Sequence, residues 1–266
     1  MKKLIMIMLS VIIATCALSA CGSKGDWDYI EEKGTIIVGF DPHFPPMGFF
    51  EDESETESSK AVGFDVEVAK AMAELLDVTV EFKSIDWSQK AVELKSKNID
   101  LIWNGYTITD ERSEQHLFST PYMKNDQVIV ILKSNESTYT CLDDLIGQTV
   151  AVQKGSSAQE IIDGMSNIPK NTVLPFDDYA DAIMALSNDV EYIVMDSVVA
   201  KYLANENNTL LVLSDVLGTE EYGIGMRAEC TETQKIINEA LETLKTNGKL
   251  AEIAAKWGLT DDLLIK

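Results

Sequence analysis

The sequence predicts an α/β protein made of two similar units with a ligand cleft between them. Apolar segments typical of strands alternate with helical patterns along most of the chain, which favours a parallel or mixed sheet covered on both faces. Residues 84–105 align without a gap on residues 175–196, and each segment reads as an acid-capped helix, a short polar turn and an apolar strand. The few identities do not establish a sequence repeat, so the prediction depends on the shared architecture.

The first unit begins with a β-branched strand and continues as an alternation of helices and strands. An acidic stretch, residues 51–60, is too polar to pack and is expected to be an exposed, hairpin-like excursion. Asp65 is expected to cap the helix that follows. The expected elements are a strand at 35–40, a helix at 65–76, a strand at 78–83, a helix at 87–96 and a strand at 101–103.

The second unit repeats this alternation after residues 127–132, with strands expected at 149–152, 172–174, 192–195 and 210–213. In open α/β sheets, ligands bind beyond the carboxyl ends of the strands. This places Asn104 and Gly105 at the binding edge of the first unit and Asp196 at that of the second. Two such edges facing each other make a cleft.

The amino-terminal residues indicate export. Lys2 and Lys3 precede an apolar run at residues 4–17, and residues 18–21 read LSAC. The run is short for a membrane span, so we expect a signal peptide of residues 1–20, cleaved before Cys21. The pattern resembles the lipobox of bacterial lipoproteins, which implies a lipid on Cys21 and a tether and lead-in at residues 21–33. A plain secretory signal is the alternative.

Charge argues against a nucleic-acid partner. The chain has 22 Lys and Arg against 44 Asp and Glu, a net charge of −22, and removal of residues 1–20 would make it −24. Such a surface repels phosphate backbones and mildly favours cationic solutes. No second membrane span is apparent, so we expect membrane contact through the lipid anchor only.

Two cysteines, Cys141 and Cys230, remain in the folded part. Outside the cell they could form a disulfide, and the sequence leaves that pairing open. The two histidines, His43 and His116, stand apart from any metal-ligand spacing, so no metal and no cofactor are expected.

Arg112 is one of only two arginines and follows closely after the strand at 101–103. A guanidinium binds a carboxylate through two parallel hydrogen bonds, which lysine cannot do. A surface salt bridge with Asp110 or Glu111 is the alternative.

Two further features complete a candidate receptor for a zwitterion. Residues 155–157 (GSS) precede a helix expected from about Ala158, so their N–H groups and hydroxyls could hold an anion, although helix capping explains the serines equally well. Asp196 could hold an ammonium group or merely cap the next helix. Arg112 and the Ser157 N–H would then take a carboxylate, and Asp196, Thr107 and the Gly105 carbonyl an ammonium.

Six ordered motifs resemble the polar amino-acid family of solute-binding proteins of ABC transporters. They cover most of residues 34–257 and read FDPHFPP (40–46), VGFDV (62–66), TITDER (107–112), VQKGSS (152–157), VMD (194–196) and YGIGMR (222–227). The resemblance implies a type II periplasmic-binding-protein fold. Lobe 1 would comprise residues 34–132 and 222–266 and lobe 2 residues 133–221, with crossings near 127–133 and 221–227 acting as a hinge.

The resemblance also implies roles for individual residues. Arg112, with the backbone of Thr107 and Ser157, would clamp the α-carboxylate, and Asp196 with the Gly105 carbonyl would take the α-ammonium. The pocket for the ligand side chain would be lined by Asp41, Phe44, Trp87, Asn104 and Gln153, and we also expect Tyr106 and Ser156 to belong to the ligand site.

The expected ligand is a polar amino acid, with arginine, lysine, histidine, glutamine and cystine all compatible with Asp41. The family implies ABC permease subunits as partners, and we expect a monomer on the surface of a Gram-positive cell. Two alternatives are an amino-acid sensor domain and a dehydratase-like enzyme on the same fold. The absence of a second membrane span after residue 257 argues against the sensor domain. No pair of catalytic groups is apparent, so an enzyme is not expected.

Overall fold

The computed structural model describes residues 25–52, 54–186 and 188–265. The expected signal peptide and Cys21 lie outside these ranges. In the described ranges, no helix combines the length and apolar character needed to cross a bilayer.

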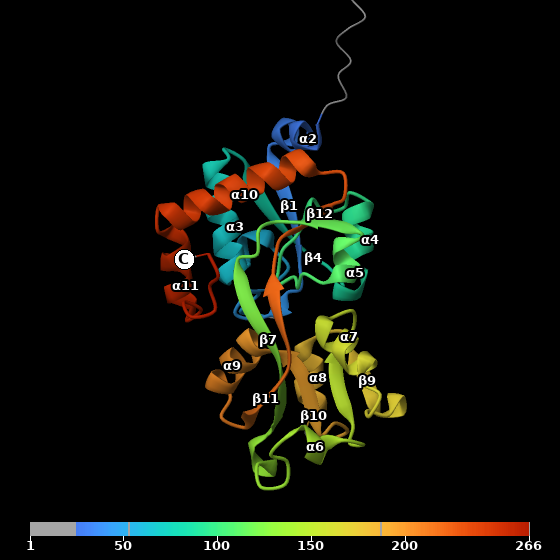
Figure 1. The fold of residues 1–266 in the computed structure, drawn as a ribbon. Coiled ribbons are helices and arrows are strands. Elements are labelled where there is room, and N and C mark those ends of the chain that lie inside the picture. Colours follow the sequence, from blue (N-terminus) through green and yellow to red (C-terminus); the bar gives the residue numbers. More distant parts are fainter. Residues whose placement is uncertain (1–24, 53, 187, 266) are drawn as a thin grey trace, which may run out of the picture.

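Two five-stranded sheets form the framework, one above the other in Figure 1. The first has the order β4-β1-β5-β12-β6, with β1 parallel to both neighbours and β12 antiparallel to both of its own. Its strands are β1 (Thr35–Phe40), β4 (Thr79–Ser84), β5 (Leu101–Ile102), β6 (His116–Phe118) and β12 (Gly225–Arg227). A separate hairpin is formed by β2 (His43–Phe44) and β3 (Gly48–Phe49).

The second sheet has the order β11-β7-β10-β8-β9. Its strands are β7 (Met123–Leu132), β8 (Val150–Gln153), β9 (Val173–Phe176), β10 (Tyr192–Asp196) and β11 (Leu210–Tyr222). We call the first sheet with its helices lobe 1 and the second sheet with its helices lobe 2. The predicted α/β class with strands alternating with helices is confirmed.

Helices cover both lobes. In lobe 1, α3 and α10 lie on one side of the sheet and α4 on the other (Figure 1). The helices of this lobe are α2 (Asp26–Lys33), α3 (Phe64–Leu75), α4 (Lys90–Lys95), α5 (Asp110–Ser113), α10 (Thr231–Thr246) and α11 (Lys249–Trp257). Those of lobe 2 are α6 (Leu142–Leu145), α7 (Ser157–Gly164), α8 (Tyr179–Ala185) and α9 (Ser197–Glu206).

Alternation along β10 shows how one strand serves two layers. Ile193 and Met195 pack in the core that includes residues of α8 and α9, whereas Tyr192 and Val194 pack with residues of α6 and α7. Every residue of β10 is buried. A strand covered on both faces therefore reads as an unbroken apolar run, which is the signal that predicted it.

The connection between the lobes differs from the expected boundary. β7 pairs with β11 along its whole length, from Leu132 opposite Leu210 to Met123 opposite Tyr222, and also with β10. The expected first lobe, residues 34–132, therefore assigned β7 to the wrong sheet, and this crossing precedes residues 127–133. The second crossing lies between the end of β11 at Tyr222 and the start of β12 at Gly225.

One local expectation needs correction. Asp65 does not cap α3, because the helix begins at Phe64 and Gly63 is its N-cap with φ of 130°. The acidic stretch at 51–60 is a mostly exposed loop that ends in a 3₁₀ turn at Ser58–Lys60. An antiparallel bridge between Phe49 and Val62 closes this loop, as expected of a hairpin-like excursion. The lead-in to β1 includes a helix, α2, whose Trp27 and Ile30 are buried.

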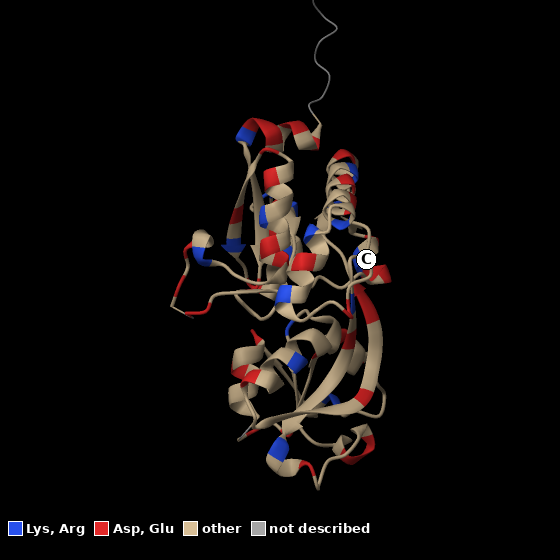
Figure 2. Cartoon of the chain, turned by 90° about the vertical axis from the view of Figure 1, so that its left-hand side faces the viewer, with Lys and Arg blue, Asp and Glu red and all other residues tan. Residues whose placement is uncertain are grey.

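Acidic residues are spread over both lobes, with basic residues between them (Figure 2). The strong negative charge is therefore a general property of the surface.

Candidate functional site

The carboxyl ends of β1 and β5 in lobe 1 meet those of β8 and β10 in lobe 2. A small cavity lies between them. Nine of the twelve predicted ligand residues line it: Phe44, Trp87, Gly105, Thr107, Arg112, Gln153, Ser156, Ser157 and Asp196. Of the other three, Asp41 bonds to Gln153, Asn104 bonds to Asp41, and Tyr106 lies under Arg112.

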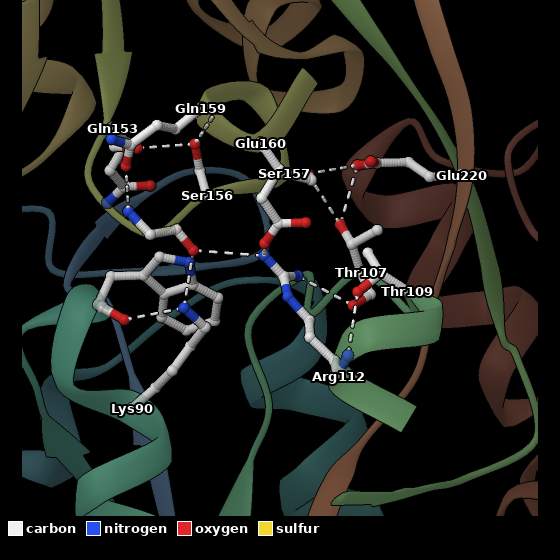
Figure 3. Close-up of polar contacts among 12 residues, drawn as sticks. Lys90, Thr107, Thr109, Arg112, Gln153, Ser156, Ser157, Gln159, Glu160 and Glu220 are labelled. Atoms are coloured by element: carbon white, nitrogen blue, oxygen red, sulfur yellow. Dashed lines mark hydrogen bonds and ion pairs between the residues drawn. The ribbon is translucent and has the colours of Figure 1, made fainter. Parts of the chain in front are cut away.

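Arg112 extends from the short helix α5 toward lobe 2 (Figure 3). Its Nη1 donates to the Thr107 carbonyl at 2.9 Å, and its Nη2 donates to Gly155 O at 3.3 Å and to Glu160 Oε1 at 2.7 Å. The guanidinium also lies 5.0 Å from the centre of the Tyr106 ring. The alternative salt bridge with a neighbour in α5 is wrong, because the carboxylate that Arg112 contacts belongs to α7.

One Nη1 hydrogen and the Nε hydrogen of Arg112 have no hydrogen-bond partner in the described part of the chain. A guanidinium held this firmly, and only 7% exposed, retains donors for a further carboxylate.

The Gly-Ser-Ser segment begins α7, one residue earlier than expected. Ser156 is the N-cap, and its hydroxyl accepts a hydrogen bond from Gln159 N at 3.1 Å. The capping interpretation thus holds for Ser156. Ser157 is the first helical residue, and its hydroxyl lies 3.2 Å from the Thr107 hydroxyl of lobe 1 (Figure 3). Its N–H belongs to the first turn, where helix geometry provides no acceptor.

Asp196 ends β10 and is 4% exposed. Its side chain makes no cap bond to α9. Instead Oδ1 accepts hydrogen bonds from Asn125 at 2.8 Å, Gln127 at 2.9 Å and the Tyr222 hydroxyl at 2.7 Å, and Oδ2 accepts one from the Tyr179 hydroxyl at 2.9 Å. Burial raises the pKa of Asp196 above its ordinary value, and the neighbouring carboxylate of Glu220 adds to the rise.

A second polar cluster forms the other end of the site. Gln153 Nε2 donates to Asp41 Oδ2 at 2.5 Å, and the N–H of Asp41 donates to Asn104 Oδ1 at 2.8 Å. Burial raises the pKa of Asp41 to about 6, although hydrogen bonds from the His43 N–H and from Gln153 oppose the rise. Phe44 stacks on Tyr179 of lobe 2 with ring centres 5.9 Å apart.

Lys90 is a buried cation at the same cleft that the sequence did not reveal. Its Nζ donates to the Gly155 carbonyl of lobe 2 at 2.8 Å and to the Trp87 carbonyl at 3.1 Å. Burial lowers the pKa of Lys90 to about 7, and the charge of Arg112 lowers it further. In sequence, a lysine on a short helix looks like an ordinary surface residue.

Glu220, Glu160 and Asp65 were also missed. Glu220 and Glu160 gave no signal, because acidic residues are common throughout this chain. Asp65 was misread as a cap. It is 1% exposed, and its Oδ2 accepts a hydrogen bond from the N–H of Gly105 at 2.7 Å, so it holds the loop that carries the cleft residues.

Both cysteines of the described chain are free thiols. Cys230 precedes α10 at one end of the molecule and Cys141 precedes α6 at the other (Figure 1). The disulfide that the sequence left open is therefore not formed. Within the described ranges, no group of three or more His, Cys, Asp or Glu side chains is arranged to hold a metal ion.

Known proteins are similar to this chain over most of its length. Residues 36–260 match the model of the bacterial extracellular solute-binding proteins, family 3. The L-cystine-binding protein TcyJ of Escherichia coli K12 is 29% identical over 258 residues, 96% of this chain and 94% of that protein. The arginine-binding extracellular protein ArtP of Bacillus subtilis 168 is 32% identical over 264 residues, 97% of this chain and 98% of that protein.

Among solved structures, an ABC uptake transporter substrate-binding protein from Streptococcus pneumoniae with bound histidine is 37% identical, with a TM-score of 0.81. The match covers 88% of this chain and 96% of that one. This likeness confirms the predicted type II periplasmic-binding-protein fold. The chain belongs to the bacterial extracellular solute-binding proteins, family 3.

Proposed function

We propose that this protein captures a polar amino acid in the cleft between its lobes and delivers it to the permease of an ABC importer. The observation that carries the proposal is the pair Arg112 and Asp196. These residues have opposite charges, come from different lobes and line one cavity. A cleft with a buried cation and a buried anion matches the carboxylate and ammonium of an amino-acid zwitterion. The binding proteins that this chain resembles support it further.

Arg112 would bind the α-carboxylate through its remaining N–H donors, with the N–H groups of Thr107 and Ser157. Asp196 and the Gly105 carbonyl would bind the α-ammonium. Ligand contacts on both lobes would favour the closed arrangement, because a ligand shifts a conformational equilibrium only through its differential affinity for the two states.

The side-chain pocket would discriminate among amino acids through Asp41 and Gln153. A buried carboxylate next to an amide favours a cationic or amide group over an apolar one. Phe44 and Trp87 would cover the apolar stem of that group, and Asn104 would hold Asp41 in place. We therefore propose a basic amino acid, glutamine or cystine as ligand.

Lipid on Cys21 would hold this monomeric protein at the outer face of a Gram-positive cell membrane, close to its permease. A binder released by a cell without an outer membrane would be lost with its ligand. Metabolic labelling with a clickable fatty acid tests the anchor, because labelling should disappear in Cys21→Ser.

A thermal-shift screen of the amino acids with cystine and ornithine tests the function. An amino acid present at 100 times its dissociation constant should stabilise the protein by about 2.7 kcal/mol. The Arg112→Ala variant should bind about a hundredfold to several thousandfold more weakly, since an unpaired buried carboxylate costs about 3–5 kcal/mol.

Lys235→Ala is the matched control, because it removes an exposed cation of α10 and should bind as the wild type does. Calorimetry that finds near-native affinity in Arg112→Ala would disprove the zwitterion assignment. Consumption of the amino acid by the protein would instead favour an enzyme.

A further inference from the structure

Glu220 places a second carboxylate at the cleft, beside Asp196. It lies near the end of β11, and its Oε1 accepts four hydrogen bonds. The Thr107 hydroxyl of lobe 1 donates at 2.9 Å, the amides of Asn125 and Gln127 donate at 2.7 and 2.8 Å, and the Ser157 hydroxyl of lobe 2 donates at 3.2 Å. Figure 3 shows this oxygen pointing at Thr107 and Ser157. One carboxylate oxygen is thus in contact with Thr107 of lobe 1 and with β7 and α7 of lobe 2.

Two amide groups bridge this oxygen to Asp196. Asn125 Nδ2 donates to Asp196 Oδ1 at 2.8 Å and to Glu220 Oε1 at 2.7 Å, and Gln127 Nε2 donates to the same two oxygens at 2.9 and 2.8 Å. Two acceptors that share an amide nitrogen at these distances are at most about 5.5 Å apart. The two carboxylates are therefore fixed as a close pair.

No cation bonds directly to either member of the pair within the described ranges. The titratable groups that face Asp196 are Glu220 and the hydroxyls of Tyr179 and Tyr222. Both hydroxyls are donors whose pKa burial raises well above the ordinary value, so they remain neutral. Arg112 lies on the other side of Thr107 from Glu220, and its guanidinium bonds to Glu160 (Figure 3).

Two carboxylates this close, with one of them buried, repel each other and disfavour the doubly charged state. Burial followed by the charge of Glu220 raises the pKa of Asp196, in agreement with this expectation. An empty pair lowers its free energy by retaining one proton. A ligand ammonium can supply the missing positive charge in its place.

We propose that Glu220 and Asp196 together form the receptor for the ligand's ammonium group, and that ligand binding expels a proton shared by the empty pair. This inference rests on the proposed function. When an amino acid binds, the carboxyl O–H bond breaks, the proton passes to solvent, and ammonium N–H donors take its place on the carboxylate oxygens. Capture is thereby coupled to pH.

The sign of the coupling follows from proton linkage. Below the pKa of the pair, ligand and proton compete, so affinity rises with pH and levels off once the pair is fully ionised. We expect affinity on the order of tenfold weaker at pH 5.5 than at pH 8. The number of protons released per ligand should approach one as the pH falls through this range.

The test is isothermal titration calorimetry of the full chain with L-arginine, L-lysine, L-glutamine and L-cystine, at several pH values from 5.5 to 8. The side chains of these amino acids do not titrate in that range, whereas that of histidine does. Proton release is compared below pH 7, where the α-ammonium groups of the ligands stay protonated. Repeating the titrations in phosphate and in imidazole, whose ionisation enthalpies differ, measures the protons released. In Glu220→Gln, proton release should decrease and affinity should depend less on pH, because the burial of Asp196 remains while the repulsion from Glu220 is removed.

Glu221→Gln is the matched control, because it makes the same change at the exposed neighbour on β11 and should behave as the wild type does. Wild-type binding without proton release, or equal release in Glu220→Gln, overturns the inference and leaves the proposed function standing. A uniform loss of affinity in Glu220→Gln with unchanged release does the same, since it indicates only a structural role. Failure of every amino acid in the thermal-shift screen to bind, these four included, overturns both.

Discussion

Gln153 donates a hydrogen bond of 2.5 Å to Asp41. This bond crosses the cleft, since Asp41 follows β1 in lobe 1 and Gln153 ends β8 in lobe 2. The Asp41 carboxylate is 4% exposed and also accepts a hydrogen bond from the His43 N–H at 2.9 Å. A buried carboxylate therefore lies where the ligand's side chain is expected, and a substitution that removes its charge tests whether that charge contributes to binding.

Asp41→Asn should reduce the affinity for ligands with a cationic side chain more than the affinity for ligands with a neutral one. The change keeps the shape of the side chain and removes its charge. If the pocket accepts a cationic side chain, arginine or lysine should bind about 10- to 100-fold more weakly, because hydrogen bonds to charged groups contribute about 1.5–3 kcal/mol. Glutamine should change only a few-fold. Competition calorimetry measures both, and Asp261→Asn, at an exposed position that does not line the cavity, serves as the charge control. Equal loss for cationic and neutral ligands would show that Asp41 acts only on the shape of the cleft.

Gly105→Ala should damage both stability and binding. Gly105 has φ of 58°, and an added Cβ would lie 2.7 Å from Phe44 Cε1 and 3.1 Å from the Tyr222 ring. A left-handed backbone with a side-chain overlap costs about 1–3 kcal/mol, and displacement of Phe44 would disturb the cavity. The unfolding free energy, from urea titration, should fall together with ligand affinity.

Gly164→Ala is the control for that change. Gly164 ends α7, and no atom outside its local helix lies within 4 Å of an added Cβ. Alanine is there expected to be neutral or to stabilise by about 0.5–1 kcal/mol. Similar behaviour of the two alanine variants would mean that Gly105 needs neither its conformation nor its space.

Local patterns pointed to residues at strand ends that the structure brings to the cleft. Asp196 was found because it ends an apolar strand, and Arg112 because arginine is rare in this chain. Both observations need only a few consecutive residues. The same applies to Ser157 at the start of a helix.

Residues whose role depends on distant segments could not be predicted. The local sequence around Glu220 is like that around many surface acidic residues. Glu220 contacts Thr107 and Ser157 only after three separate parts of the chain pack together. The boundary at residue 132 failed for a similar reason. The first part of β7, at residues 123–127, is rich in polar residues, and its pairing with β11 becomes apparent only in the sheet. For Asp65 the local pattern predicted a helix cap that is not present. Gly63 is the N-cap instead, and the Asp65 side chain is buried.

Asp65→Asn should change how stability depends on pH. Burial raises the pKa of Asp65 to about 7, whereas its hydrogen bond from the Gly105 N–H lowers it. The folded state therefore binds a proton that the unfolded chain releases between about pH 4 and 7. This contribution to the unfolding free energy is fully present below pH 4 and is lost as the pH rises to 7.

An asparagine cannot ionise, so the variant avoids that loss while its side-chain oxygen can still accept the Gly105 hydrogen bond. Relative to the wild type, Asp65→Asn should gain about 2–4 kcal/mol in unfolding free energy between pH 5 and pH 8. Urea titrations at the two pH values measure the difference, with Glu74→Gln on the exposed face of α3 as control. If Asp65→Asn differs from the wild type by the same amount at both values, the carboxyl is already ionised in the folded protein. The loop that carries Gly105 would then depend on a charged anchor.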